Sequence, residues 1–295
     1  MPGAGEILVG VDGSPHSDAA VVWAAAEAAS RCTGLMIAHA LDANSIGLWT
    51  TTASIRRELR ELAQPIIDHA IEVANASQPS VHCRGRVLIG SPTRTLLLLS
   101  GRVPLVAVGR SGRGSLAQLW LGSVTQRVLA HAACPAVAVG LANESSGRRT
   151  VSHVVVGLDD DAVESSVLGF AFDLAARRRV PLDTVHAVPR PGWPAGAPPG
   201  ADTAHLVEVA EERQTKVLHD WRVRFPGVVV TSTVRVGRPA DVLSAACRPD
   251  DLLVLGYHRS APLLPRHLGP AAAAALHDAP CSVAVVHGPT ADAAR

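Results

Sequence analysis

The segment ILVGVDGSPHSDAAVVWAAAEAA, residues 7–29, returns in recognisable form as VVVGLDDDAVESSVLGFAFDLAA at residues 154–176. Each copy begins with a short apolar run, passes through a polar stretch and continues with apolar residues at spacings of three and four. This order is typical of a buried strand, a turn and an amphipathic helix. A strand and helix that occur in this order twice favour an α/β fold.

The repeat extends over the whole chain at one fixed offset of 147 residues. Six landmark residues recur at that offset: Asp12 as Asp159, His39 as His186, Gly90 as Gly237, Gly109 as Gly256, Gly122 as Gly269 and Cys134 as Cys281. A constant offset indicates the duplication of a domain with almost no net insertion. We therefore predict two domains, residues 1–143 and 151–288, each large enough to bury its own core.

Two polar stretches compete for the role of linker. GLANESSGRRTVS, residues 140–152, lies between two apolar runs and is predicted to join the domains. PRPGWPAGAPPGADT, residues 189–203, is richer in proline and glycine, but it aligns with the segment after the second strand of the first half. We therefore predict a long surface loop inside the second domain for residues 189–203.

Short apolar runs alternate with longer helical stretches in each half. The strands predicted in the first half are Ile7–Val11, Leu35–Ala40, Val81–Val87, Leu105–Val108 and Ala136–Val139. Runs that are apolar throughout, such as LVAV, are typical of a parallel sheet covered on both faces. The expected fold class is α/β, with two tandem Rossmann-like domains that each contain a five-stranded parallel sheet flanked by helices.

The composition excludes several classes of function. The 27 basic and 26 acidic residues leave a net charge of +1, and no basic stripe with aromatic residues predicts a nucleic-acid partner. The amino end lacks a basic segment followed by a long apolar one, so we expect a cytoplasmic protein without a membrane partner. Five scattered cysteines without a CxxC pattern predict neither a disulfide framework nor a zinc site. Lys216 is the one lysine, which excludes a Walker A loop.

Candidate ligand-binding residues follow the first two strands. Ligands of open α/β sheets bind at the carboxyl ends of the strands, where the strand order reverses. Asp12 comes directly after the first strand, and its carboxylate could bond to ribose hydroxyls, help to hold a metal with phosphates, or simply cap the next helix. At the end of the second strand, the small Ala40 would leave room for an adenine ring, whereas we interpret His39 as structural.

The segment VAVGRSGRGSLAQLWLGSVTQRVLAHA, residues 106–132, is the strongest candidate for a phosphate site. Glycines at positions 109, 112 and 122 allow backbone N–H groups to approach phosphate oxygens. The helix predicted to begin near Ser123 would direct its dipole at the same anion. Ser123 and Thr125 could add hydroxyl bonds, and Arg110 and Arg113 could add charge. The alternative is a flexible surface turn.

The VGVDGS segment, the HA after the second strand and the GRSGRG…LGSVTQRVLAHAACPAVAV segment resemble the universal stress protein family over nearly the full chain. The resemblance implies the adenine nucleotide alpha hydrolase-like type of Rossmann-like fold, and ATP, with or without Mg²⁺, as ligand. It implies that adenosine contacts Gly10, Val11, Asp12 and Ala40. It implies that the phosphates are held by Gly109, Arg110, Gly112, Gly122, Ser123, Val124 and Thr125. It further implies a homodimer formed through a last strand, Ala136–Val139 or Val283–Val286.

The second half departs from this pattern. Asp159, Ala187, Gly256 and Gly269 are retained, but Arg259 stands at the second glycine position and Pro270 at the serine position. A Cβ at the former and the loss of a hydroxyl and a backbone donor at the latter disfavour phosphate binding. We expect the second domain to bind ATP weakly or not at all.

Three functions are compatible with the sequence. The first is an ATP-binding regulator of stress response or growth arrest with an unknown protein partner, which is not an enzyme. The second is a slow ATPase or phosphotransferase, which needs a general base near the γ-phosphate; His16 and His131 are interpreted as solvent-exposed histidines instead. The third is an interaction module without nucleotide.

Overall fold

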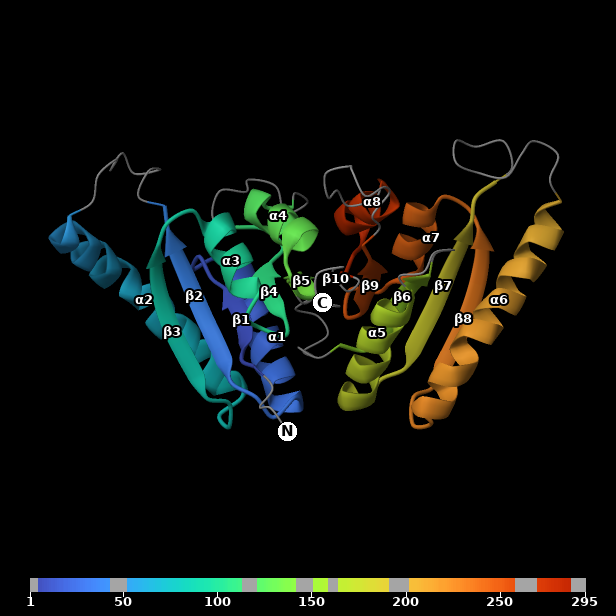
Figure 1. The fold of residues 1–295 in the computed structure, drawn as a ribbon, viewed down its shortest axis with the longest axis horizontal. Helices are drawn as coiled ribbons and strands as arrows, with labels where there is room; N and C mark the ends of the chain where they lie inside the picture. Colours follow the sequence, from blue (N-terminus) through green and yellow to red (C-terminus); the bar gives the residue numbers. More distant parts are fainter. Residues whose placement is uncertain are drawn as a thin grey trace, which may run out of the picture. The chain divides into compact units, whose positions relative to one another are not determined.

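The computed structural model describes residues 5–42, 52–112, 121–141, 151–158, 164–190, 202–257 and 270–287 (Figure 1). The chain divides into two compact units, Met1–Arg149 and Thr150–Arg295. Residues 142–150 of the predicted linker and residues 191–201 of the predicted surface loop lie outside the described residues. Each unit contains strands and helices in the same alternating order, as the duplication predicts.

The first unit is a parallel sheet with strand order β3-β2-β1-β4-β5. Its elements are β1 (Ile7–Gly10), α1 (Pro15–Ser30), β2 (Leu35–Leu41), α2 (Ala53–Ser77), β3 (Cys83–Ile89), α3 (Pro92–Ser100), β4 (Val106–Gly109), α4 (Ser123–His131) and β5 (Ala136–Val139). The predicted α/β class and the five parallel strands are confirmed. The first four strands differ from their predicted bounds by one or two residues at their ends, and the fifth agrees.

The second unit has the equivalent order β10-β9-β6-β7-β8, again with parallel pairing. Its elements are β6 (Val154–Leu158), α5 (Glu164–Arg178), β7 (Leu182–Val188), α6 (Thr203–Arg224), β8 (Val230–Val236), α7 (Pro239–Ala246), β9 (Leu252–Gly256), α8 (Pro270–Asp278) and β10 (Ser282–Val286). The last strand begins one residue before its predicted start. Among the described residues, none of the helices combines the length and apolar composition needed to cross a membrane.

The central strands are apolar because helices cover both of their faces. In the first unit, Ile7, Leu8 and Val9 of β1 are fully buried, and so are Val106 and Ala107 of β4. Burial of both faces removes the alternation of polar and apolar residues that a half-exposed strand would show. The sheet is therefore a rigid layer, and the segments that leave its carboxyl edge start from fixed points.

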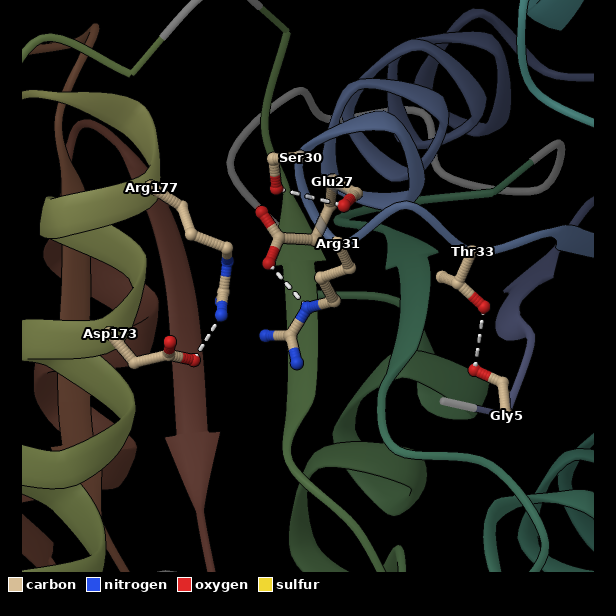
Figure 2. Close-up of polar contacts among 7 residues, drawn as sticks. All are labelled: Gly5, Glu27, Ser30, Arg31, Thr33, Asp173 and Arg177. Atoms are coloured by element: carbon tan, nitrogen blue, oxygen red, sulfur yellow. Dashed lines mark hydrogen bonds and ion pairs between the residues drawn. The ribbon is translucent and has the colours of Figure 1, made fainter. Parts of the chain in front are cut away.

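Local ion pairs stabilise the helices that follow β1 and β6 (Figure 2). At the end of α1 the fully buried Glu27 pairs with Arg31, the residue that follows the helix, with 2.7 Å between Oε1 and Nε. In α5, Asp173 pairs with Arg177 at the same spacing of four residues. Residues four apart share one face of a helix, so these pairs form without distorting the backbone.

The strand order places one point of reversal in each unit. In the first unit, the chain moves from β1 outward to β2 and β3, then returns to β4 on the other side of β1. Gly10 of β1 pairs with Val108 of β4, so the carboxyl ends of these two strands lie side by side. Ligands of open parallel sheets bind at such a reversal. The candidate site is therefore built from the segments that follow β1 and β4.

Candidate functional site

The segment after β1 turns sharply into α1. Asp12 accepts a hydrogen bond from the Ser14 N–H, with 3.0 Å between N and Oδ1, and Gly13 makes the turn at a φ of 76°. Ser14 is the N-cap of α1 and accepts a bond from the Ser17 N–H at 3.2 Å. The alternative interpretation of Asp12 as a helix cap is therefore wrong. Its half-buried carboxylate instead lies at the carboxyl edge of the sheet, beside the end of β4.

Two glycines of the segment after β4 are required for different reasons. A Cβ at Gly109 would lie 2.7 Å from the carbonyl carbon of His16 and 2.8 Å from its oxygen, so β4 can end against the first turn of α1 only without a side chain. A Cβ at Gly112 would lie 2.6 Å from Oδ2 of Asp12. The backbone at Gly112 therefore packs directly against the Asp12 carboxylate, and the segments after β1 and β4 form one surface.

The segment between these glycines is anchored on two sides. The Arg110 N–H donates to the Val139 carbonyl of β5 at 2.8 Å, and the Gly122 N–H donates to the Arg110 carbonyl at 2.9 Å. Oγ of Ser111 lies 3.1 Å from Nε2 of His16, and Ser111 is buried. The interpretation of His16 as a solvent-exposed histidine is wrong, because α1 presents it half-buried to this segment. His131, at the end of α4, is exposed.

Helix α4 begins at the same edge, and its first backbone donors receive no side-chain cap from the described residues. Gly122 occupies its N-cap position, and no side chain of the described residues caps the helix. The N–H groups of the first turn, at Ser123, Val124 and Thr125, are those that an α-helix leaves without partners within the helix. Ser123 is exposed, whereas the Thr125 hydroxyl donates to the Gly109 carbonyl at 2.7 Å. Thr125 therefore offers a ligand its backbone donor, and its hydroxyl ties α4 to β4.

The end of β2 forms the third side of the site. Ala40 is half-buried at this end. His39 is buried, and its Nδ1 lies 2.7 Å from the Val11 carbonyl oxygen. The equivalent His186 makes the same contact to the Leu158 carbonyl at 3.1 Å. Each histidine thus fixes the start of the segment after the first strand of its unit, which is a structural role.

Burial favours a neutral His16. Burial lowers the pKa of His16, the Arg110 guanidinium lowers it further, and the Asp12 carboxylate opposes both effects. The described residues contain no cluster of three carboxylate, imidazole or thiol side chains arranged for a metal. Arg113, the second predicted cation, lies outside the described residues.

The site chemistry suits the phosphate groups of a nucleotide. Glycines leave space where a Cβ would collide, and an uncapped helix terminus offers N–H donors at the same edge. Within the described residues, the Asp12 carboxylate lies beside the backbone at Gly112, where it could share a cation with a ligand. A magnesium ion, if it enters with ATP, would therefore take most of its ligands from phosphate oxygens and water.

The second unit keeps the backbone framework and changes the side chains. The Tyr257 N–H donates to the Val286 carbonyl at 3.0 Å, which repeats the bond made by Arg110 in the first unit. Tyr257 is buried, so an apolar ring stands where the first unit has a guanidinium. Pro270 begins α8 at the position of Ser123. Ala187 lies in β7 and Gly256 ends β9, whereas Asp159, Arg259 and Gly269 lie outside the described residues.

Some of these features could not be found in the sequence. The bond between Ser111 and His16 joins residues 95 positions apart, and neither residue belongs to the glycine pattern. Tyr257 stands 147 residues after Arg110, so the repeat shows that the second half lacks this arginine. The glycine pattern alone does not show that difference.

Comparisons with known proteins agree with this architecture. Residues 4–140 and residues 150–287 each match the universal stress protein family. Universal stress protein Rv2005c of Mycobacterium tuberculosis is 30% identical over 290 residues, which cover 95% of this chain and 96% of the relative. Universal stress protein Rv1996 of the same species is 31% identical over 309 residues, with 96% and 95% covered. The crystal structure of a universal stress protein from Archaeoglobus fulgidus DSM 4304 matches with a TM-score of 0.67 at 16% identity, with 96% of each chain covered.

Proposed function

This chain belongs to the universal stress protein family, with two family domains in tandem, and we propose that its first domain binds ATP as a regulatory ligand. The observation that carries the proposal is the contact between Gly112 and Asp12 at the reversal of the sheet, where a Cβ would lie 2.6 Å from Oδ2. This contact joins the two segments that a nucleotide would bridge, and it leaves a surface of backbone donors beside one carboxylate.

Each part of ATP has proposed partners in the first domain. Gly10, Val11 and Asp12 would contact adenosine, with Asp12 bonding to ribose hydroxyls or sharing Mg²⁺ with the phosphates. Ala40 would leave room for the adenine ring. The proposed phosphate-binding residues are Gly109, Arg110, Gly112, Gly122, Ser123, Val124 and Thr125. The bound nucleotide supplies the negative charge of its phosphates, and the start of α4 supplies N–H groups and the positive end of a helix dipole.

Regulation, rather than turnover, is the proposed outcome of binding. The segment around Gly112 meets the start of α1 and lies next to α4, so a ligand that orders it would change the surface offered to a protein partner. We place this function in the cytoplasm and expect a homodimer formed through β5 or β10. Size-exclusion chromatography with light scattering, with and without ATP, tests the oligomeric state. A slow ATPase would release phosphate from ATP at a rate proportional to protein, and an interaction module would bind no nucleotide.

A substitution at Gly122 tests the proposal without disturbing the fold. A Cβ at this position would lie 3.4 Å from Oγ1 of Thr125, which is ordinary contact, and Asp is a favourable N-cap. Gly122→Asp therefore keeps α4 but places a carboxylate against the phosphates, which we expect to reduce ATP affinity about tenfold or more. Gly122→Asn has the same size without the charge, so the difference between the two variants measures the electrostatic part.

The assay begins with protein purified without added nucleotide, denatured, and analysed for adenine nucleotide per chain. One ATP per chain, lost in Gly122→Asp, supports binding by the first domain alone. Two per chain would contradict the proposal that the second domain, with Pro270 and Arg259, is degenerate. No co-purified nucleotide, together with no binding of added ATP in calorimetry, would favour the interaction module.

A further inference from the structure

We propose that His16 is a positioning residue for the phosphate-binding segment, because its hydrogen bond to Ser111 holds the backbone of Gly112 against Asp12 before ATP binds. The inference rests on the proposed function and adds to it a residue outside the glycine pattern. His16 would raise the affinity for the phosphates through Ser111.

The two residues come from different elements that meet at the site. His16 is in the first turn of α1, directly after the turn that carries Asp12, and Ser111 follows β4. Oγ of Ser111 and Nε2 of His16 are 3.1 Å apart, and Ser111 is only 4% exposed. Because His16 is half-buried, the bond is partly sheltered from water, which strengthens it relative to a surface hydrogen bond.

The rest of the segment shows why this bond matters. Arg110 makes two backbone bonds: its N–H donates to the Val139 carbonyl, and its carbonyl accepts from the Gly122 N–H. These bonds fix Arg110, the first residue after β4. Ser111 and Gly112 come next, and the side-chain bond to His16 fixes Ser111 from the opposite side. Fixing the backbone of one residue costs about 1–2 kcal/mol of conformational entropy. A segment that is already ordered avoids this cost when the ligand binds.

The state of the imidazole suits this role. Burial and Arg110 lower the pKa of His16, so the ring is neutral at neutral pH. In one neutral tautomer Nε2 accepts a hydrogen bond from the Ser111 hydroxyl, and in the other the Nε2–H group donates one to Oγ, so the contact persists in both tautomers. The Asp12 carboxylate in the preceding turn raises the pKa of His16, and the Arg110 guanidinium after β4 lowers it.

The repeat provides an independent argument. The positions 147 residues after His16 and Ser111 carry Val163 and His258, which lie outside the described residues. Valine cannot make this hydrogen bond. The first domain therefore has both the intact glycine pattern and the pair of His16 and Ser111. The second domain has neither the pattern nor the pair.

A double-mutant cycle on the full chain tests the inference. The dissociation constants of ATP and of adenosine are measured by calorimetry for the natural protein, His16→Ala, Ser111→Ala, the double variant and His16→Gln. We expect each alanine variant to weaken ATP about three- to tenfold, the magnitude of one hydrogen bond. The double variant should be no weaker than either single variant, because both remove the same interaction.

The adenosine measurements separate positioning from general damage. Adenosine lacks the phosphates, so its affinity should be unchanged in every variant, and His16→Gln, which keeps a hydrogen-bonding side chain, should recover most of the ATP affinity. Additive losses, or equal losses for ATP and adenosine, would overturn the inference, as would unchanged ATP affinity in His16→Ala. If the natural protein binds ATP but the variants do not show the expected affinities, the inference fails and the proposed function stands. If the natural protein binds neither ligand, both are overturned.

Discussion

Replacement of Gly112 by alanine should damage ATP binding while the fold remains intact. The added Cβ would lie 2.6 Å from Oδ2 of Asp12, and real Cβ contacts are essentially never shorter than 3.0 Å. The Asp12 carboxylate must therefore turn aside, or the segment after β4 must shift, by about 0.4 Å or more. Because the end of a side chain moves more easily than backbone, we expect a cost of about 1 kcal/mol, the lower end of the range for overpacking. Because this change falls where the two segments meet, we expect a loss of about fivefold in ATP affinity.

Calorimetric titration with ATP measures this loss, and thermal unfolding without nucleotide measures the fold. Gly227→Ala is the matched control, because a Cβ there meets nothing within 4 Å, and it should leave both measurements unchanged. Unchanged ATP affinity in Gly112→Ala would refute the argument that this contact forms the nucleotide surface. A large drop in unfolding temperature would instead assign Gly112 to the stability of the domain.

Three further experiments test the framework of the first unit. Gly109→Ala should lower the free energy of unfolding by about 1–3 kcal/mol, since its Cβ would meet the backbone of α1 at 2.7 Å and backbone cannot move aside; chemical denaturation measures this. His39→Ala should cost about 1–3 kcal/mol by leaving the buried Val11 carbonyl without its partner, and an unchanged denaturation midpoint would contradict that role. Cys32 is exposed and should react first with a thiol reagent at about pH 8. Cys134 is buried, and burial raises its pKa to about 12, so Cys134 should react only after unfolding.

The sequence predicted the fold well because the repeat and the apolar runs report burial directly. The predicted strand bounds were less accurate than the predicted fold, because a buried residue does not always belong to the hydrogen-bonded part of a strand. Val81 is buried, and this burial explains the predicted start of the third strand, but the parallel pairing with β2 begins only at Cys83. Apolar periodicity reports which residues face the core, and it carries no direct information about which residues join the hydrogen-bonded ladder.

The candidate site was predictable only in part. A glycine pattern after a strand identifies where backbone can approach a ligand, so Gly109 and Gly112 could be found without a structure. The partner of each polar side chain could not, because it depends on contacts between distant segments. The Thr125 hydroxyl, expected to face phosphate, donates to the Gly109 carbonyl, and the bond between Ser111 and His16 spans two elements.

The two units show that the fold and the ligand site depend on different interactions. Backbone bonds build the edge of each sheet, and they recur where the side chains differ: Arg110 and Tyr257 donate the same N–H to the neighbouring strand. His186 repeats the structural contact of its counterpart in the first unit. Ligand recognition depends instead on space, charge and free donors, which Tyr257 and Pro270 alter without breaking any of those bonds. The second domain can therefore differ from the first at the proposed nucleotide site and still keep its sheet.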